Sequence, residues 1–160
     1  MKKPGSTTLP SLLQRALIGA ALWLGCVGAQ AQFQMVPPPA TAGPPAGSAA
    51  DTDKAYRVDG ARHLYATYPT RILRGMMPPL MYSVMVVETT IDGAGLVTGV
   101  SVVRPPAAPE VGPWVIAMIR RAAPFPAPAR LPGGTAKYFE VWLVDKSGLF
   151  QVDTLTEGQR

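Results

Sequence analysis

Two valine-rich runs on either side of residues 92–95 (Asp-Gly-Ala-Gly) constrain the fold of this chain more than any other feature. Residues 80–91 are rich in Val, Met, Tyr and Thr, and residues 96–103 alternate with valines. The Asp-Gly pair supplies the positive φ angles that a tight turn requires, and Gly95 offers a second such position. We therefore predict a β-hairpin, and with it an antiparallel sheet.

Two helices are predicted, one before and one after this hairpin. Residues 51–65 should form a short helix, capped by Asp51 or Asp53 and ending before Tyr68-Pro69. The second helix begins at Pro109-Glu110, as the first-turn preferences for proline and an acid predict. Its apolar stripe recurs at helical spacing and consists of Val111, Val115, Met118 and Ala122, widened by Trp114 and Ile119.

Two further strands follow the second helix. Residues 137–145 form the third, and residues 149–152 form a short fourth strand after a turn. The element order is α-β-β-α-β-β, so we predict an α+β fold in which two helices pack on one face of a small antiparallel sheet of three to four strands. Both faces of the third strand are substantially apolar. One face is therefore core, and the other is covered by a helix or by a partner.

The N-terminal segment has the three zones of a secretory signal peptide, predicted over residues 1–31. A basic start precedes an apolar stretch of about 14 residues, and Ala29-Gln30-Ala31 then places the cut before Gln32. A bilayer span needs roughly 20 apolar residues, so a permanent anchor is the weaker interpretation. Cys26, the only cysteine, is an alternative site of lipidation. Residues 32–50 are a Pro/Ala/Gly-rich tether, and residues 51–160 are the folded domain.

Charge and cysteine usage exclude several functions. The formal net charge is +5, but Lys2, Lys3 and Arg15 lie in the predicted signal peptide, which leaves 12 basic and 10 acidic residues. A nucleic-acid partner is therefore not expected. Removal of Cys26 would also exclude disulfides, thiolate catalysis and Cys-ligated metals, as suits an oxidising compartment.

The sequence predicts no catalytic residue, cofactor, metal or small-molecule substrate, and hence no enzyme. His63 is the only histidine, and its spacing from Asp59 indicates a solvated helix pair rather than half a metal site. Asp92, Asp145 and Asp153 could supply paired carboxylates for acid–base catalysis. Asp92 and Asp145, however, lie where a turn already explains an aspartate. The aromatic residues could stack on a ligand but are more often core residues, and Trp114 belongs to the helix stripe.

Taken together, these features resemble the TonB C-terminal domain family, which includes TolA-like domains. The matching features cover roughly residues 55–155. They are Tyr68-Pro69, the strand 84–90 with its turn at 91–95, the strand 97–103, the helix 111–122, Pro124-Phe125-Pro126 and the strand 138–144. The chain departs from the family at Pro78-Pro79 and Pro105-Pro106, and its linker is short.

The resemblance implies a periplasmic module that binds an envelope protein, or a peptide of an outer-membrane transporter, by adding it as a strand to its own sheet. The implied docking edge is the strand 137–144, with Tyr138, Glu140, Val141 and Trp142 as the residues that contact the partner. Two alternatives stay open. One is a membrane-anchored energy transducer for TonB-dependent transport. The other is a self-associating envelope scaffold, such as a homodimer formed through free strand edges.

Overall fold

The computed structural model describes residue 33, residues 35–39 and residues 45–158. The predicted signal peptide, Cys26 and part of the predicted tether lie outside the described residues. Within the described part, no helix combines the length and the apolar character needed to cross a membrane.

The predicted hairpin is present as strands β1 (Ser83–Ile91) and β2 (Val97–Arg104). Its turn is held by Asp92, whose Oδ1 accepts hydrogen bonds from the N–H groups of Ala94 (2.9 Å) and Leu96 (2.8 Å). In this turn the positive φ belongs to Gly95, at +82°, and not to Gly93. A Cβ at residue 95 would lie 2.1 Å from the carbonyl oxygen of Phe125, so glycine is required for both reasons.

Both predicted helices are present, as α3 (Asp53–Thr67) and α4 (Val111–Arg121). The N-cap of α3 is Thr52, whose hydroxyl accepts a hydrogen bond from the N–H of Ala55 at 3.2 Å, so the predicted Asp51 or Asp53 cap is wrong. Gly60 is buried in the middle of this helix. A Cβ there would lie 2.8 Å from the Tyr138 hydroxyl, which shows that the small residue lets α3 approach the sheet closely.

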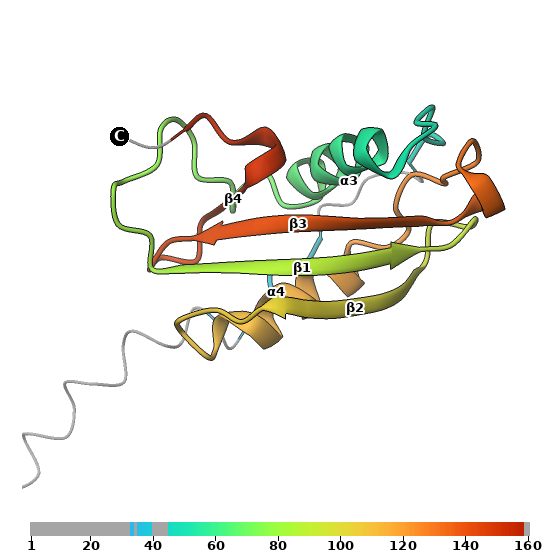
Figure 1. Ribbon diagram of the computed structural model, residues 1–160. Helices are drawn as coiled ribbons and strands as arrows, with labels where there is room; N and C mark the ends of the chain where they lie inside the picture. The colour runs from blue at the N-terminus through green and yellow to red at the C-terminus, as the bar shows by residue number, and fades with distance from the viewer. Residues whose placement is uncertain (1–32, 34, 40–44, 159–160) are drawn as a thin grey trace, which may run out of the picture. The chain divides into compact units, whose positions relative to one another are not determined.

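The four strands form one antiparallel sheet in the order β2-β1-β3-β4, which confirms the predicted α+β fold (Figure 1). Strand β3 (Ala136–Val144) pairs with β1 along its whole length, from Ser83 opposite Val144 to Ile91 opposite Ala136. Strand β4 (Phe150–Val152) pairs only with the last three residues of β3. Two short 3₁₀ turns, η1 (Pro132–Gly134) and η2 (Asp153–Leu155), flank these strands.

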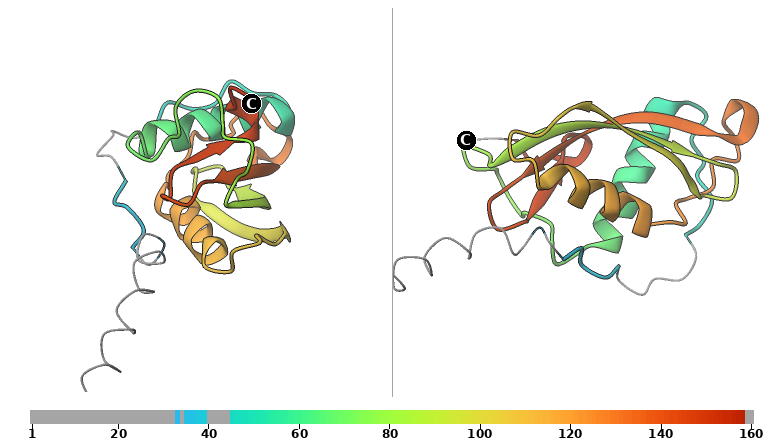
Figure 2. Two further views of the ribbon diagram at one scale, coloured as in Figure 1. Left: turned by 90° about the vertical axis from the view of Figure 1, so that its left-hand side faces the viewer. Right: turned by 90° about the horizontal axis from the view of Figure 1, so that it is seen from below.

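Both helices pack on one face of the sheet and leave the other face open (Figure 2). Burial alternates along β1 and β3, as expected for a sheet covered on one side. The buried side carries Met85, Val87, Ile91, Tyr138, Trp142 and Val144. On the other side Phe139 is 50% exposed, so this is the uncovered face that the sequence could not assign.

The described part of the predicted tether packs against the domain, and we call residues 33, 35–39 and 45–50 the strap. Phe33 is buried, stacks on Tyr82 at 5.8 Å and meets Trp114 edge-on at 5.3 Å. Arg121 donates to the carbonyl of Val36 at 3.1 Å, and Ser48 donates its N–H to the carbonyl of Ala127 at 2.9 Å. At these positions the segment that the sequence predicts to be a tether is in contact with the folded domain.

Candidate functional site

His63 and Asp59, predicted to be a solvated helix pair rather than half a metal site, each have another structural partner. The Nε2 of His63 lies 2.7 Å from the carbonyl oxygen of Ala122, and its ring packs on Phe125 with centroids 4.7 Å apart. Burial lowers the pKa of His63 below its usual value, which favours the neutral ring. Asp59 accepts a hydrogen bond from the Ser48 hydroxyl at 2.6 Å. The two side chains therefore serve different contacts.

The three other candidate carboxylates also have structural roles. Asp145 repeats the arrangement of Asp92, since its Oδ1 accepts the N–H groups of Ser147 (2.8 Å) and Leu149 (3.1 Å) at the turn before β4. Asp153 pairs with Arg57 at 3.2 Å. Among residues 33, 35–39 and 45–158, no group of three or more His, Cys, Asp or Glu side chains could hold a metal ion.

Strand β3 was predicted to be the docking edge, and the structure corrects this prediction. β3 lies inside the sheet between β1 and β4 at residues 142–144. Of the four residues predicted to contact the partner, Tyr138 (4% exposed), Glu140 (2%) and Trp142 (0%) point into the covered face. They cannot contact a partner from there, because α3 and the core cover them. Val141 alternates with them and is half-buried on the other face.

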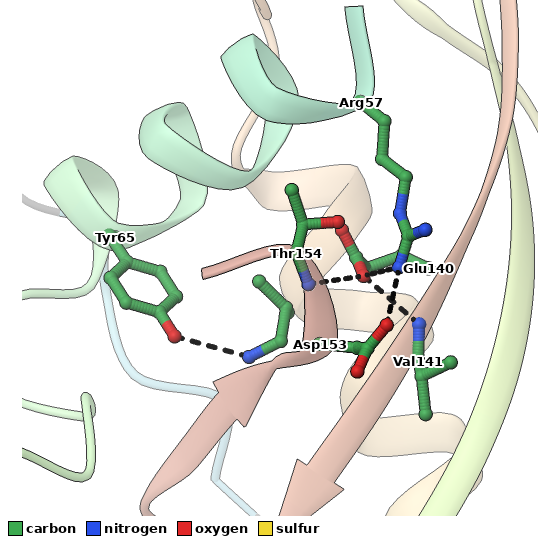
Figure 3. A network of polar contacts seen from close by, with 7 residues as sticks. Arg57, Tyr65, Glu140, Val141, Asp153 and Thr154 are labelled. Atoms are coloured by element: carbon green, nitrogen blue, oxygen red, sulfur yellow. Dashed lines mark hydrogen bonds and ion pairs between the residues drawn. The ribbon is translucent and has the colours of Figure 1, made fainter. Parts of the chain in front are cut away.

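Glu140 closes the end of the β3–β4 ladder (Figure 3). Its Oε1 accepts hydrogen bonds from the Arg57 guanidinium at 2.7 Å, the Val141 N–H at 3.1 Å and the Thr154 N–H at 3.4 Å. The hydrogen bond with Glu140 is the main cause that raises the pKa of Arg57. One carboxylate therefore ties α3, β3 and η2 together, at the point where β4 ends.

The remaining outer side of β3 faces a pocket of about 360 Å³ next to the first turns of α3. Asp53 occupies one backbone donor of this edge, since its carboxylate accepts a hydrogen bond from the N–H of Lys137 at 2.9 Å. N–H groups on one side of a strand recur every second residue, so the outward donors are those of Lys137, Phe139 and Val141. Two of these three already have side-chain acceptors, which leaves little of a free ladder for a partner strand.

Strand β2 is the opposite outer strand, and it pairs on one side only. Its inner side forms the ladder with β1, and within the described chain no strand lies along its outer side (Figure 1). Val102 is 41% exposed and Val103 is 56% exposed. Val102 pairs with the fully buried Val87, so it lies on the face of the sheet that the helices cover, although it remains partly exposed there.

The usual protection of an edge strand is weak in β2. Residues 97–103 contain no charged residue and no proline, the two residue classes that most often protect an edge. Two register shifts against β1 provide some protection, because a bulge twists an edge. The absence of charge in residues 97–103 was the sequence signal that could have indicated an unprotected edge at β2. This absence of charge can be interpreted only once the strand order is known, because it fits an inner strand equally well.

Comparison with known proteins adds no relative: no family model, no curated protein and no solved structure matches this chain.

Proposed function

We propose that this domain is a non-enzymatic protein-binding module that takes up an extended segment of an envelope protein as an additional strand at the outer edge of β2. The observation that carries the proposal is the free outer side of β2, an eight-residue strand without a described partner on that side. Strand addition uses main-chain hydrogen bonds for affinity and alternate side chains for specificity. An open edge of this length provides both.

The exposed valines support this site rather than the one on β3. A strand added beside β2 would cover Val102 and Val103, and burial of apolar area contributes about 25 cal/mol per Å². A strand added beside β3 would have to displace the carboxylates of Asp53 and Glu140 from their backbone donors. The first route gains contacts, whereas the second must first break them.

A binding role is also favoured over a catalytic one. The five candidate side chains considered above already hold a helix, a turn or the strap in place. The location that we propose, the periplasm, rests on the N-terminal sequence pattern and on the resemblance to TonB C-terminal domains.

The docking edge is tested by selection of peptides on the exported protein. A library of random extended peptides is selected on the purified chain, and binding is then measured to two matched variants, Val102→Lys and Phe139→Lys. Both side chains are similarly exposed, so both variants should fold. We expect Val102→Lys to abolish binding and Phe139→Lys to leave it unchanged, because only the first places a charge beside the added strand. Amide exchange should slow in residues 97–104 when the peptide binds.

The opposite pattern would overturn the proposal for β2. If Phe139→Lys abolished binding and protection appeared in residues 136–141, the docking edge would be β3 after all.

The location is tested by the intact mass of the protein isolated from the periplasm of its host. A mass that corresponds to residues 32–160 supports an exported, processed module. A full-length or lipid-modified mass contradicts the predicted cut before Gln32 and favours a tethered protein.

A further inference from the structure

The helix α4 flanks the outer edge of β2 and determines what an added strand would meet. α4 contacts β2, whereas α3 packs on β3. The side of α4 toward α3 is identified by Met118, whose carbonyl accepts a hydrogen bond from the Tyr68 hydroxyl at 2.9 Å. At 100° per residue, Ile116 and Arg120 lie on the side of the helix away from α3 and from the strap. They are therefore the α4 side chains nearest to a strand added at β2.

The direction of α4 places its charged end at one end of β2. The N–H of Phe125, just after the helix, donates to the carbonyl of Gly95 at 2.8 Å, so the C-terminal end of α4 lies beside the start of β2. Arg120 belongs to this last helical turn, and Arg104 ends β2. The outer edge of β2 thus has an exposed arginine near each end and half-buried or exposed apolar side chains between them.

These two arginines have no acidic partner in the described part of the chain. Neither Arg104 nor Arg120 forms an ion pair there, and β2 and α4 contain no acidic residue. The nearest carboxylates in sequence are occupied: Glu110 accepts the Tyr82 hydroxyl, and Asp92 holds the hairpin turn. Neither arginine therefore has an ion-pair partner among the residues that the structure describes.

We infer that the segment bound at β2 is an extended polypeptide with alternating apolar side chains in its middle and an acidic side chain toward each end. This inference rests on the proposed function. The apolar part would cover Val102 and Ile116, and the acidic ends would meet Arg104 on the open face and Arg120 on the helix face. Complementary rim charges of this kind contribute mainly to specificity and to the rate of association.

The same charges argue against a second copy of this chain as the occupant. An antiparallel pair of two β2 strands would bring Arg104 of one copy to the end of the edge where Arg120 of the other lies. Each end would then carry two arginines, and the nearby Asp92 carboxylate already accepts two backbone N–H groups of the hairpin turn. A segment with acidic ends would neutralise these arginines, whereas a second copy of the chain would place further arginines beside them.

The inference is tested with the peptides selected on the exported protein. We expect those that depend on Val102 to share acidic residues on both sides of an apolar run, and this preference to disappear when selection is repeated on the Arg104→Glu/Arg120→Glu variant. Replacement of the acids by Gln or Asn should weaken binding about three- to tenfold at low salt, and the difference should vanish at high salt. Arg130→Glu, a charge reversal at an exposed loop position, is the matched control and should not change the preference.

Three results would overturn the inference, and they are distinguishable. Peptides that depend on Val102 but show no acidic preference would refute the charge pattern and leave the proposed function in place. Peptides that do not depend on Val102 would refute the docking edge itself, and the inference with it. A dimer in sedimentation whose residues 97–104 become protected as the concentration rises would identify the occupant as a second copy.

Discussion

The two outer edges of this sheet are built in opposite ways. On one side β4 and η2 cover the end of β3, and the carboxylates of Asp53 and Glu140 take up backbone donors where no strand is present. On the other side β2 ends the sheet with apolar side chains exposed, and no carboxylate of the described residues accepts a hydrogen bond from its backbone. This difference agrees with the proposal that the first edge serves stability and the second binds a partner, and the following predictions test that division.

The largest effect is expected from Phe150→Ala at the closed edge. Phe150 is fully buried and packs on Trp142 with ring centroids 4.7 Å apart. Removing a buried phenylalanine costs about 3–5 kcal/mol, because contacts are lost and a cavity remains. Val103→Ala at the open edge is the matched control and should change the free energy of unfolding by no more than about 0.5 kcal/mol. Similar losses for both variants in urea unfolding would contradict the division.

Glu140→Ala should have the next largest effect. It removes the buried acceptor of Arg57, Val141 and Thr154, and loss of one partner of a buried ion pair costs about 3 kcal/mol or more. The matched control is Glu88→Ala, whose pair with Lys137 at 3.1 Å is more exposed and should be worth less than about 1 kcal/mol. Amide exchange should also become faster at Val141 and Thr154. Unchanged exchange there would show that the carboxylate does not close the edge.

Phe33→Ala should lower the stability of the domain without changing peptide binding at β2. Phe33 is buried against Tyr82 and Trp114, which belong to neither outer strand, and its loss should lower the free energy of unfolding by about 2–3 kcal/mol. Affinity of selected peptides for β2 should stay within about twofold, since exposed surface at the edge is unaltered. An affinity loss in a folded variant would show that the strap also shapes the β2 edge.

The smallest effect concerns the pH dependence of stability. The pKa of His63 is lowered by burial in the folded protein, so the unfolded chain binds its proton first as the pH falls below about 6.5. Stability should therefore fall between pH 6.5 and the lower folded pKa, by less than about 1 kcal/mol. The His63→Gln variant should lack this part of the fall in thermal melts between about pH 7.5 and pH 5.5. Parallel curves for the two proteins would exclude His63 as the cause.

Local features of the fold were predictable from the sequence because local chemistry determines them. Asp92 with Gly95 and Asp145 with Gly148 form the predicted turns, and the valine-rich runs beside the first turn form the two strands of the predicted hairpin. The N-cap was missed because Asp51, Thr52 and Asp53 are all good capping residues. Asp53 is instead used on Lys137, 84 residues away in sequence.

The position of the site depended on long-range pairing and could not be read locally. An acid in a predicted edge strand suggested an exposed contact residue, but Glu140 is buried because Arg57 neutralises it from a helix 83 positions earlier in the chain. Likewise, the absence of charge in residues 97–103 fits an inner strand as well as an unprotected outer one. Only the pairing of β1 with β3 leaves β2 at the edge.

The packing of Phe33 has a consequence for how the protein would mature. If the chain is cut before Gln32, as the sequence predicts, this aromatic ring belongs to the second residue of the exported protein. The processing site and the folded unit then share the same few residues. A cut two residues further along would release a protein that lacks part of its own core, so the accuracy of the peptidase would decide how stable the exported molecule is.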